Sequence, residues 1–237
     1  MRYAASIIIT TMVLLGCQQD RSMEPIDVND PVDQILVRFI QASGGREAIA
    51  QVTTRIVKGI WKDDRPYRGK AITSPFTVWA HKDGRWRYES EYEVYGVDSI
   101  GGWWLEKGYV RDDSAQIRSK SAFLFVPQSP LHIDRWFQDR KLGTATLING
   151  RSAKSIKTDR DDTYYALWID DSSGTVIRIG SYWTLSDYQR FDGIQFPMRI
   201  EQSRKGGSIV LDVESVIQNQ VIPDALLRRP EVVKNKG

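Results

Sequence analysis

The strict alternation of residues 84–96, GRWRYESEYEVYG, constrains the fold more than any other stretch of the sequence. One set of alternate residues is mostly aromatic and the other is charged: Trp86, Tyr88, Ser90, Tyr92 and Val94 against Arg85, Arg87, Glu89, Glu91 and Glu93. Because successive side chains of a strand point to opposite faces of a sheet, this pattern predicts a half-buried strand. Its aromatic side is expected to face the interior and its charged side the water.

Similar short segments follow one another from residue 53 onward. Turn residues separate them at Lys82-Asp83-Gly84, Asn149-Gly150, Asp192-Gly193 and Lys205-Gly206-Gly207. We count about nine to eleven strands, and the connections are too short for parallel crossovers. The pattern predicts a mainly β (α+β) fold, a large curved antiparallel sheet closed by helices. The concave side of such a sheet is either filled by aromatic side chains or left as a ligand cavity.

The first helix is expected between residues 31 and 43. Asp30 suits the N-cap, Pro31 the first helical position, and the pair Gly44-Gly45 the end of the helix. Its apolar side consists of Ile35, Leu36, Phe39 and Ile40. A second, short helix is expected over residues 46–52. Both are expected to cover the sheet.

A third helix is expected from Ser129-Pro130 to about Arg140, with Leu131, Ile133, Trp136 and Phe137 on its apolar side. The segment just before it, SAFLFVPQ, is more apolar than a surface loop. It predicts either a strand or a mobile apolar flap.

Residues 1–16 form a separate segment. Arg2 precedes an uncharged, mostly apolar run at 4–15. As a helix this run is about 18 Å long, too short for a hydrocarbon core of about 30 Å, and it is typical of a secretory signal. The sequence Leu-Leu-Gly-Cys at 14–17 resembles the bacterial lipoprotein signal, in which cleavage precedes a cysteine that is then acylated.

This resemblance implies that Cys17, the single cysteine of the chain, carries the lipid anchor. The alternative is a free thiol in an ordinary exported protein. Gln18, where an aspartate would stand for inner-membrane retention, implies the outer membrane of a Gram-negative cell, with the protein facing the periplasm. Residues 17–29 are expected to form a flexible tether, and residues 30–237 a single domain.

Catalytic and metal-binding patterns are missing from the sequence. The two histidines, His81 and His132, are far apart, and no H-E-x-x-H, G-x-S-x-G, S-x-x-K or P-loop motif occurs. The formal net charge of +3, over 33 basic and 30 acidic residues, does not indicate nucleic-acid binding. We therefore expect a protein that is not an enzyme, without catalytic residues, metal or cofactor. A discontinuous site of an envelope hydrolase stays open as an alternative.

Aromatic residues supply the candidates for ligand contact. Adjacent residues of a strand face opposite sides, so at most one of Trp103 and Trp104 enters a given core. The candidate residues for lining a cavity are Trp86, Tyr88, Tyr92, Trp103, Trp104, Phe123, Phe125 and Trp136.

Several stretches together resemble LolA/LolB-like outer-membrane lipoprotein-sorting proteins. ILVRFIQASGGREAIAQVTTRIVKG is similar to their first helix, Gly-Gly corner and first strand, and LWIDDSSGTVIRI to a later hairpin. YQRFDGIQFPMRIEQSRKGGSIVLDVESVIQNQVIPDALLRRP is similar to their final meander. The resemblance implies an open, incomplete antiparallel β-barrel of about eleven strands, covered by helices, with an apolar cavity. In a receptor-type member, FLFVP at 123–127 is a candidate for an exposed loop that enters the membrane.

Two functions follow as hypotheses. The first is an anchored protein that binds lipid or lipoprotein acyl chains in the cavity of a half-barrel, with the helices at 31–52 and 130–140 as the lid. The second is an envelope protein-interaction or stress-sensing module with a packed core. Its partner surface would be the charged ladder formed by Arg85, Arg87, Glu89, Glu91 and Glu93.

Overall fold

The computed structural model describes residues 29–64, 69–106, 109–112, 123–135, 140–157, 166–204 and 206–231. In this part of the chain fourteen strands form one continuous antiparallel sheet. The strands are β1 (Thr54–Asp63), β2 (Ile72–His81), β3 (Trp86–Ser90), β4 (Val94–Val97), β5 (Gly102–Glu106), β6 (Tyr109–Asp112), β7 (Lys141–Leu142), β8 (Thr146–Ile148), β9 (Arg151–Lys157), β10 (Leu167–Asp170), β11 (Val176–Ile179), β12 (Trp183–Phe191), β13 (Ile194–Arg204) and β14 (Gly207–Gln218).

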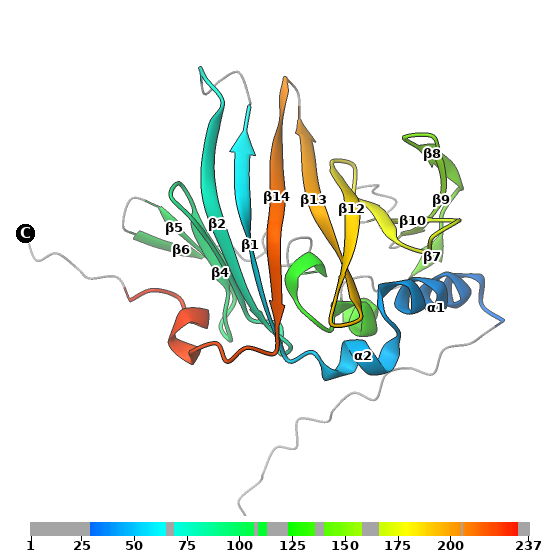
Figure 1. Ribbon diagram of the computed structural model, residues 1–237, viewed down its shortest axis with the longest axis horizontal. Helices are drawn as coiled ribbons and strands as arrows, with labels where there is room; N and C mark the ends of the chain where they lie inside the picture. Colours follow the sequence, from blue (N-terminus) through cyan, green and yellow to red (C-terminus); the bar gives the residue numbers. More distant parts are fainter. Residues whose placement is uncertain are drawn as a thin grey trace, which may run out of the picture.

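Two meanders make up this sheet. Strands β1 to β6 run in sequence toward one edge, and β14 back to β9 run toward the other, where β7 and β8 both pair with β9. The first and last strands, β1 and β14, pair with each other and join the halves. Figure 1 shows β2, β1, β14, β13 and β12 side by side as a broad wall between the two ends of the sheet.

The predicted antiparallel, mainly β architecture is confirmed, but the strand number is higher than the predicted eleven. One reason lies in the segment that predicted a single strand over residues 84–96. Ser90 breaks it, because its Oγ accepts hydrogen bonds from the backbone N–H of Tyr92 (3.3 Å) and Glu93 (3.1 Å). The chain turns there, so β3 and β4 are two paired strands, and Val94 falls opposite Glu89 rather than on the side of Trp86.

The first two helices lie where the sequence predicts them. Helix α1 (Pro31–Ser43) is capped by Asp30, whose carboxylate accepts from the backbone N–H of Val32 (2.6 Å) and Asp33 (3.2 Å). Gly44 ends it at φ 132°, where a Cβ would lie 2.7 Å from the carbonyl oxygen of Gly193. Helix α2 (Arg46–Gln51) follows. Figure 1 shows both helices along one rim of the sheet.

The expected third helix differs from the prediction. Its described part is a 3₁₀ segment, η2 (Ser129–Arg135), with a kink at His132 (φ −120°, ψ 40°). Residues 123–125 before it form one helical turn, neither a strand nor an exposed flap. Their burial, described below, explains why this segment is so apolar.

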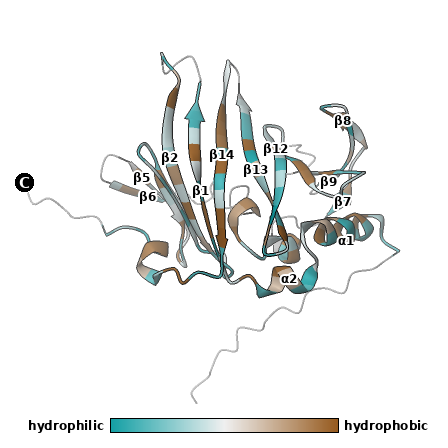
Figure 2. Cartoon of the chain, in the orientation of Figure 1, coloured by the Kyte–Doolittle hydropathy of each residue, from teal (hydrophilic) through white to brown (hydrophobic). Residues whose placement is uncertain are grey.

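The two faces of the sheet follow from the strand registers, because directly opposed residues share a face. Val57, Val78 and Tyr88 form one such row on the concave side. The main core lies there, between these strands, α1 and residues 123–126. Figure 2 shows hydrophobic and hydrophilic residues interleaved along the strands, as a sheet with two unlike faces requires.

The C-terminal segment covers part of the opposite, convex face. After β14 the chain turns at Asn219, and Thr54 Oγ1 donates to the carbonyl of Gln220 (2.7 Å). A short 3₁₀ helix, η4 (Asp224–Leu227), then contacts β2 and β3. Arg229 fastens the end, donating to Asp98 (2.9 Å) and Asp112 (2.6 Å). Figure 1 shows η4 beside this end of the sheet.

We expect Leu227→Ala to lower the free energy of unfolding by about 2–5 kcal/mol, because Leu227 is only 1% exposed and its truncation leaves a cavity. Val221→Ala in the same segment is the matched control, since Val221 is 87% exposed, and we expect a change within about 0.5 kcal/mol. Urea unfolding of the purified protein measures both. Equal midpoints for the two variants would show that the segment does not stabilise the sheet.

Candidate functional site

Aromatic side chains from neighbouring strands line the concave face of the first meander. Tyr88 on β3 stacks between Phe76 on β2, at 5.7 Å between ring centroids, and Tyr95 on β4, at 4.7 Å. Trp86 meets the edge of Tyr95 at 5.7 Å, and Trp104 on β5 extends the row at 6.3 Å from Tyr95. Offset and edge-on contacts of this kind stabilise the rings beyond their burial.

Burial also fixes the charge state of this face. It raises the pKa of the phenols of Tyr88 and Tyr95 above the usual value, so both remain neutral at pH 7. The face therefore offers an aromatic, uncharged surface across three strands.

A segment from another part of the chain lies against this surface. Phe125 packs between Trp86 (6.3 Å) and Phe196 on β13 (6.5 Å), and Phe123 packs on Phe39 of α1 (6.1 Å). Phe123, Leu124, Phe125 and Val126 are all less than one-tenth exposed. The hypothesis that FLFVP forms an exposed membrane-entering loop is therefore wrong for residues 123–126, because their side chains are buried in the protein's own core.

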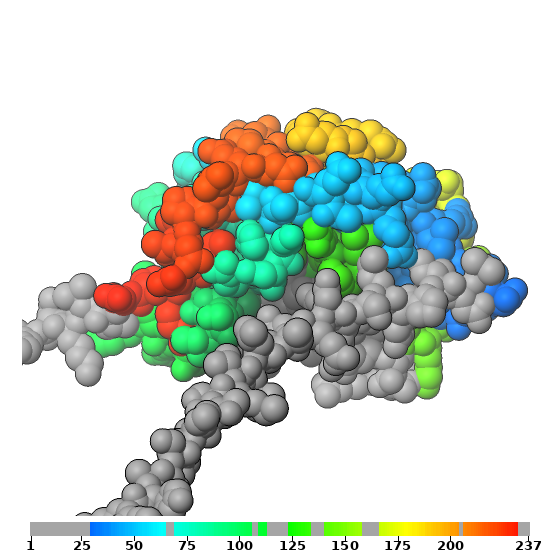
Figure 3. All heavy atoms as spheres, turned by 90° about the horizontal axis from the view of Figure 1, so that it is seen from below, coloured from blue at the N-terminus to red at the C-terminus, as the bar shows by residue number. Residues whose placement is uncertain are grey.

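Gln128 ties this segment to the end of α2, because its side-chain amide donates to the carbonyls of Ala50 (2.7 Å) and Val52 (3.3 Å). Within the segment, Ser129 Oγ donates to the carbonyl of Phe123 (2.5 Å). Residues 123–135 thus form a connected cover with α1 and α2 over the concave face. In Figure 3, residues 123–135 are seen below the strands of the sheet and next to the residues of α2.

The structure brings together four of the residues that the sequence suggested for ligand contact. Trp86, Tyr88, Phe123 and Phe125 are buried in the main core on the concave side. Trp104 lies at the margin of this face and is 40% exposed.

The remaining candidates lie elsewhere. Tyr92 is 46% exposed in the turn after β3, against Trp61 at 5.6 Å. Trp103 is fully buried, but on the convex face, because it pairs with Gly96 while Trp104 pairs with Tyr95. This corrects the inclusion of both tryptophans in one cavity. Trp136 and Cys17 lie outside the described residues.

The charged ladder is not a free surface. Arg85 pairs with Asp83 (2.8 Å) and with Asp224 of η4, and Arg87 pairs with Glu89 (2.8 Å) while lying 5.8 Å from the centroid of the Trp103 ring. The C-terminal segment thus takes up part of the surface on which the protein-interaction hypothesis depended.

Sequence reasoning missed Arg55, which points into the core from β1. It is 5% exposed, and its guanidinium lies 5.2 Å from the centroid of the Phe196 ring. Burial lowers its pKa to about 10, so the side chain is still charged at pH 7. The alternation along the strand does predict its burial, because Arg55, Val57 and Trp61 are separated by even numbers of residues and so share a face.

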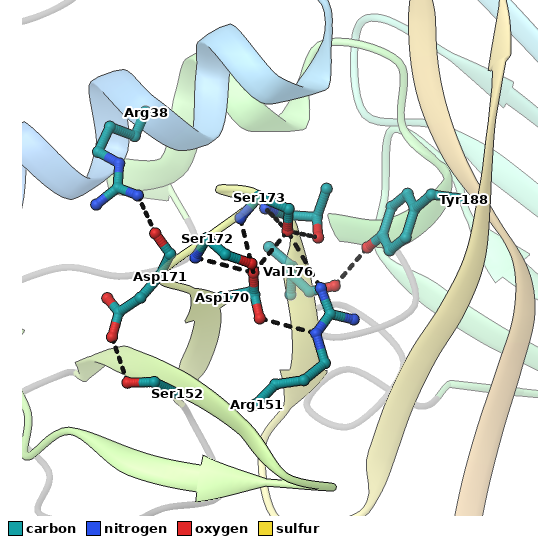
Figure 4. A network of polar contacts seen from close by, with 10 residues as sticks. Arg38, Arg151, Ser152, Asp170, Asp171, Ser172, Ser173, Val176 and Tyr188 are labelled. Atoms are coloured by element: carbon teal, nitrogen blue, oxygen red, sulfur yellow. Dashed lines mark hydrogen bonds and ion pairs between the residues drawn. The ribbon is translucent and has the colours of Figure 1, made fainter.

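A cluster of polar contacts connects α1 to the β10–β11 turn, in the second meander of the sheet (Figure 4). Asp170, 2% exposed, accepts from the backbone N–H of Ser172 (3.0 Å) and Ser173 (2.7 Å) and pairs with Arg151 (2.8 Å). These bonds shape the β10–β11 turn, and Arg38 of α1 donates to the carbonyl of Asp171 in that turn. The cluster therefore holds the helix that covers the core.

Within the described ranges, no group of three or more His, Cys, Asp or Glu residues is placed to hold a metal ion. None of the helices described there is both long and apolar enough to cross a membrane.

Solved structures with the same architecture identify the class of fold. A DUF1329 family protein from Desulfovibrio piger aligns with a TM-score of 0.56 at 15% identity, covering 84% of this chain and 98% of its own. An outer membrane lipoprotein-sorting protein domain from Vibrio parahaemolyticus aligns at 0.52 and 12% identity, covering 81% and 98%. A LolA superfamily protein from Nitrosomonas europaea aligns at 0.52 and 12% identity, covering 83% and 97%.

The class is thus an open, helix-covered antiparallel sheet. Within that class the chain has a LolA/LolB-like fold, as the sequence resemblance implied. No protein-family model and no curated protein sequence matches the chain.

We expect Asp170→Asn to lower the free energy of unfolding at pH 7 by about 3 kcal/mol, because it removes a buried ion pair and charge-assisted hydrogen bonds. Burial alone would raise the pKa of Asp170, but the hydrogen bonds from Ser172, Ser173 and Arg151 outweigh it and hold the pKa far below its ordinary value. The stabilisation is therefore complete above the unfolded-state pKa of about 3.9 and declines as the pH falls below it.

Urea unfolding of wild type and Asp170→Asn at pH 7 and pH 3 checks this, with a smaller difference expected at pH 3. Asp192→Asn, in the exposed β12–β13 turn at φ 48°, is the control and is expected to change stability little at either pH. A difference that stays constant with pH would contradict the role assigned to the ionised carboxylate.

Proposed function

We propose that this protein is a lipid-anchored component of the bacterial envelope that binds lipid or lipoprotein acyl chains along its concave face. The observation that carries the proposal is the nature of the cover. Phe125 covers the aromatic face of the sheet at Trp86, and with Phe123, Leu124 and Val126 it forms a buried segment of the main core that belongs to no strand. A lipid chain presents the same kind of surface.

The internal segment and a bound acyl chain would gain comparable free energies by burial on this face. Burial of a Phe, Leu or Val side chain contributes about 1.5–3 kcal/mol, so the four side chains contribute roughly 6–12 kcal/mol. Each buried methylene contributes about 0.8 kcal/mol, so an acyl chain of about ten to fourteen carbons offsets their displacement. A ligand can therefore exchange with the segment at modest cost, which favours reversible binding and release.

The fold supports the same proposal by analogy. Two of the similar structures are those of an outer membrane lipoprotein-sorting domain and a LolA superfamily protein. Analogy of fold does not assign a ligand, so the argument rests on the concave face itself.

We expect Phe125→Ala to tighten the binding of N-phenyl-1-naphthylamine, an uncharged apolar probe, by about threefold to tenfold. The substitution weakens the internal segment that competes with the probe, and each 1.4 kcal/mol corresponds to tenfold in affinity. Trp86→Ala, which removes part of the sheet surface, is expected to weaken binding.

Probe fluorescence titrations measure both changes. Ile177→Ala is the control for lost stability alone, because Ile177 is 3% exposed in a separate small cluster, and its affinity should equal that of wild type. Failure of folded wild type and of Phe125→Ala to bind the probe would refute the proposed function, as would an absence of lipid from protein purified out of the envelope.

For the anchor, we expect Cys17→Ser to abolish incorporation of labelled palmitate and to release the protein from the membrane fraction, because acyl chains supply the membrane affinity. Gln18→Asp is expected to keep the label and to move the protein from the outer to the inner membrane fraction. Labelling and density-gradient fractionation measure both. Palmitate incorporation into Cys17→Ser would contradict the assignment.

A further inference from the structure

One cross-strand row of the concave face contains a buried arginine. Gln218 on β14 pairs with Arg55 on β1, Arg55 pairs with Ala80 on β2, and Ala80 pairs with Trp86 on β3. All four residues are less than one-tenth exposed. Directly opposed residues share a face, so the side chains of Gln218, Arg55 and Trp86 lie on the same side, with the small Ala80 between the last two.

The polar atoms of this row lack internal partners. Among the described residues, eight buried side-chain atoms have no hydrogen bond, and three of them lie in this row: Arg55 Nε, Trp86 Nε1 and Gln218 Oε1. Gln218 is held in place by its other amide atom, because Nε2 donates to the carbonyl of Phe191 (3.0 Å). Buried polar groups nearly always find partners, so three unmatched atoms in one row need an explanation.

Among the described residues, no carboxylate forms an ion pair with Arg55, and burial is the cause of its lowered pKa. Asp63, at the other end of the same strand face, lies eight residues away, about 26 Å along a strand. Asp33 of α1 pairs with Arg140 at 3.5 Å. What Arg55 contacts is the face of Phe196, which attracts a cation but supplies no negative charge.

We propose that Arg55 receives the anionic head group of an amphiphile, with Trp86 Nε1 as a second donor and Gln218 Oε1 as an acceptor. The inference rests on the proposed function, because the apolar tail would lie along the aromatic face in place of residues 123–126. The head group is an oxyanion, a carboxylate or a phosphate ester. A hydroxyl or N–H next to it would satisfy Gln218.

The position of the row fits this arrangement. Phe125 packs against both Trp86 and Phe196, so it covers the space between the Trp86 donor and the ring beneath Arg55. Displacement of this segment by a tail would therefore uncover the charged end of the row. A neutral ligand would gain the apolar contacts but would leave the charge of Arg55 unmatched, so the site discriminates in favour of an anion.

The test compares dodecanoate, dodecyl phosphate and dodecanol as competitors of N-phenyl-1-naphthylamine, on the full chain carrying Cys17→Ser so that no detergent is needed. We expect at least one anion to bind about tenfold or more tighter than dodecanol, because charge-assisted hydrogen bonds are the stronger ones. The tighter anion distinguishes a fatty-acid source from a phospholipid source. Arg55→Gln should reduce the affinity for that anion to the level of dodecanol and leave dodecanol within about twofold of wild type.

A second readout separates ligand recognition from a structural role. We expect Arg55→Gln to raise the Tm of the ligand-free protein, because it removes a buried charge for which the described part of the chain supplies no carboxylate partner. A structural cation–π contact would give a lower Tm instead. Arg87→Gln is the matched control, since Arg87 also lies over an aromatic ring, that of Trp103, but on the convex face and paired with Glu89, and it should leave all three affinities unchanged.

The outcomes remain distinguishable. Equal affinities for the anions and dodecanol in wild type, or an equal loss for all three in Arg55→Gln, would overturn the inference while leaving apolar binding intact. No competition by any of the three compounds, together with no probe binding, would overturn the proposed function and the inference with it.

Discussion

The pairing of β1 with β14 is the constraint on which the rest of the structure depends. It joins residues as far apart as Arg55 and Gln218, 163 positions along the chain, and without it the two meanders would be separate sheets with open edges. The pairing is not regular, because the register shifts between Lys58 and Gly59. A Cβ on Gly59 would lie 2.1 Å from the carbonyl oxygen of Asp212, so only glycine permits this close approach. Irregularities of this kind bend a sheet, and a bent sheet has a concave face to fill.

The curvature gives the two faces different covers. On the concave side the helices and residues 123–126 supply apolar side chains, and on the convex side the C-terminal segment supplies Leu227 and a set of ion pairs. Because side chains alternate between the two faces, the position of a residue along its strand decides which of these environments its side chain enters. It separates Trp103 from its neighbour Trp104, and it sends Arg55 into the core while Thr54 bonds to the C-terminal segment.

Helix caps and turn residues in the sequence made several helices and turns predictable. Asp30, Pro31 and Gly44 define α1 correctly, and Asn149-Gly150 forms the β8–β9 turn with φ of 50° and 77°. The errors arose where a contact distant in sequence, or a side-chain bond to the backbone, decides the outcome. Ser90 converts an alternating strand into two, although alternation continues through the turn. Residues 123–126 were ambiguous because an apolar run indicates burial without saying against what. The burial of Arg55 was readable from parity, but its lack of a partner depends on the residues that neighbouring strands place around it.

A packed interior and a binding function are compatible when the packing is supplied by a movable segment. The rings of Trp86 and Tyr88 belong to the sheet and are fixed by cross-strand pairing, whereas Phe125 contacts Trp86 from a segment that belongs to no strand and that Gln128 bonds to the end of α2. Displacing the segment leaves the sheet ladder intact, so the cost is confined to side-chain contacts that an acyl chain can replace. The unmatched donors of Arg55 and Trp86 lie beside these rings. The internal segment satisfies the apolar part of this surface and leaves its polar part unsatisfied, which is the pattern expected if the covering segment stands in for an amphiphile's tail and not for its head.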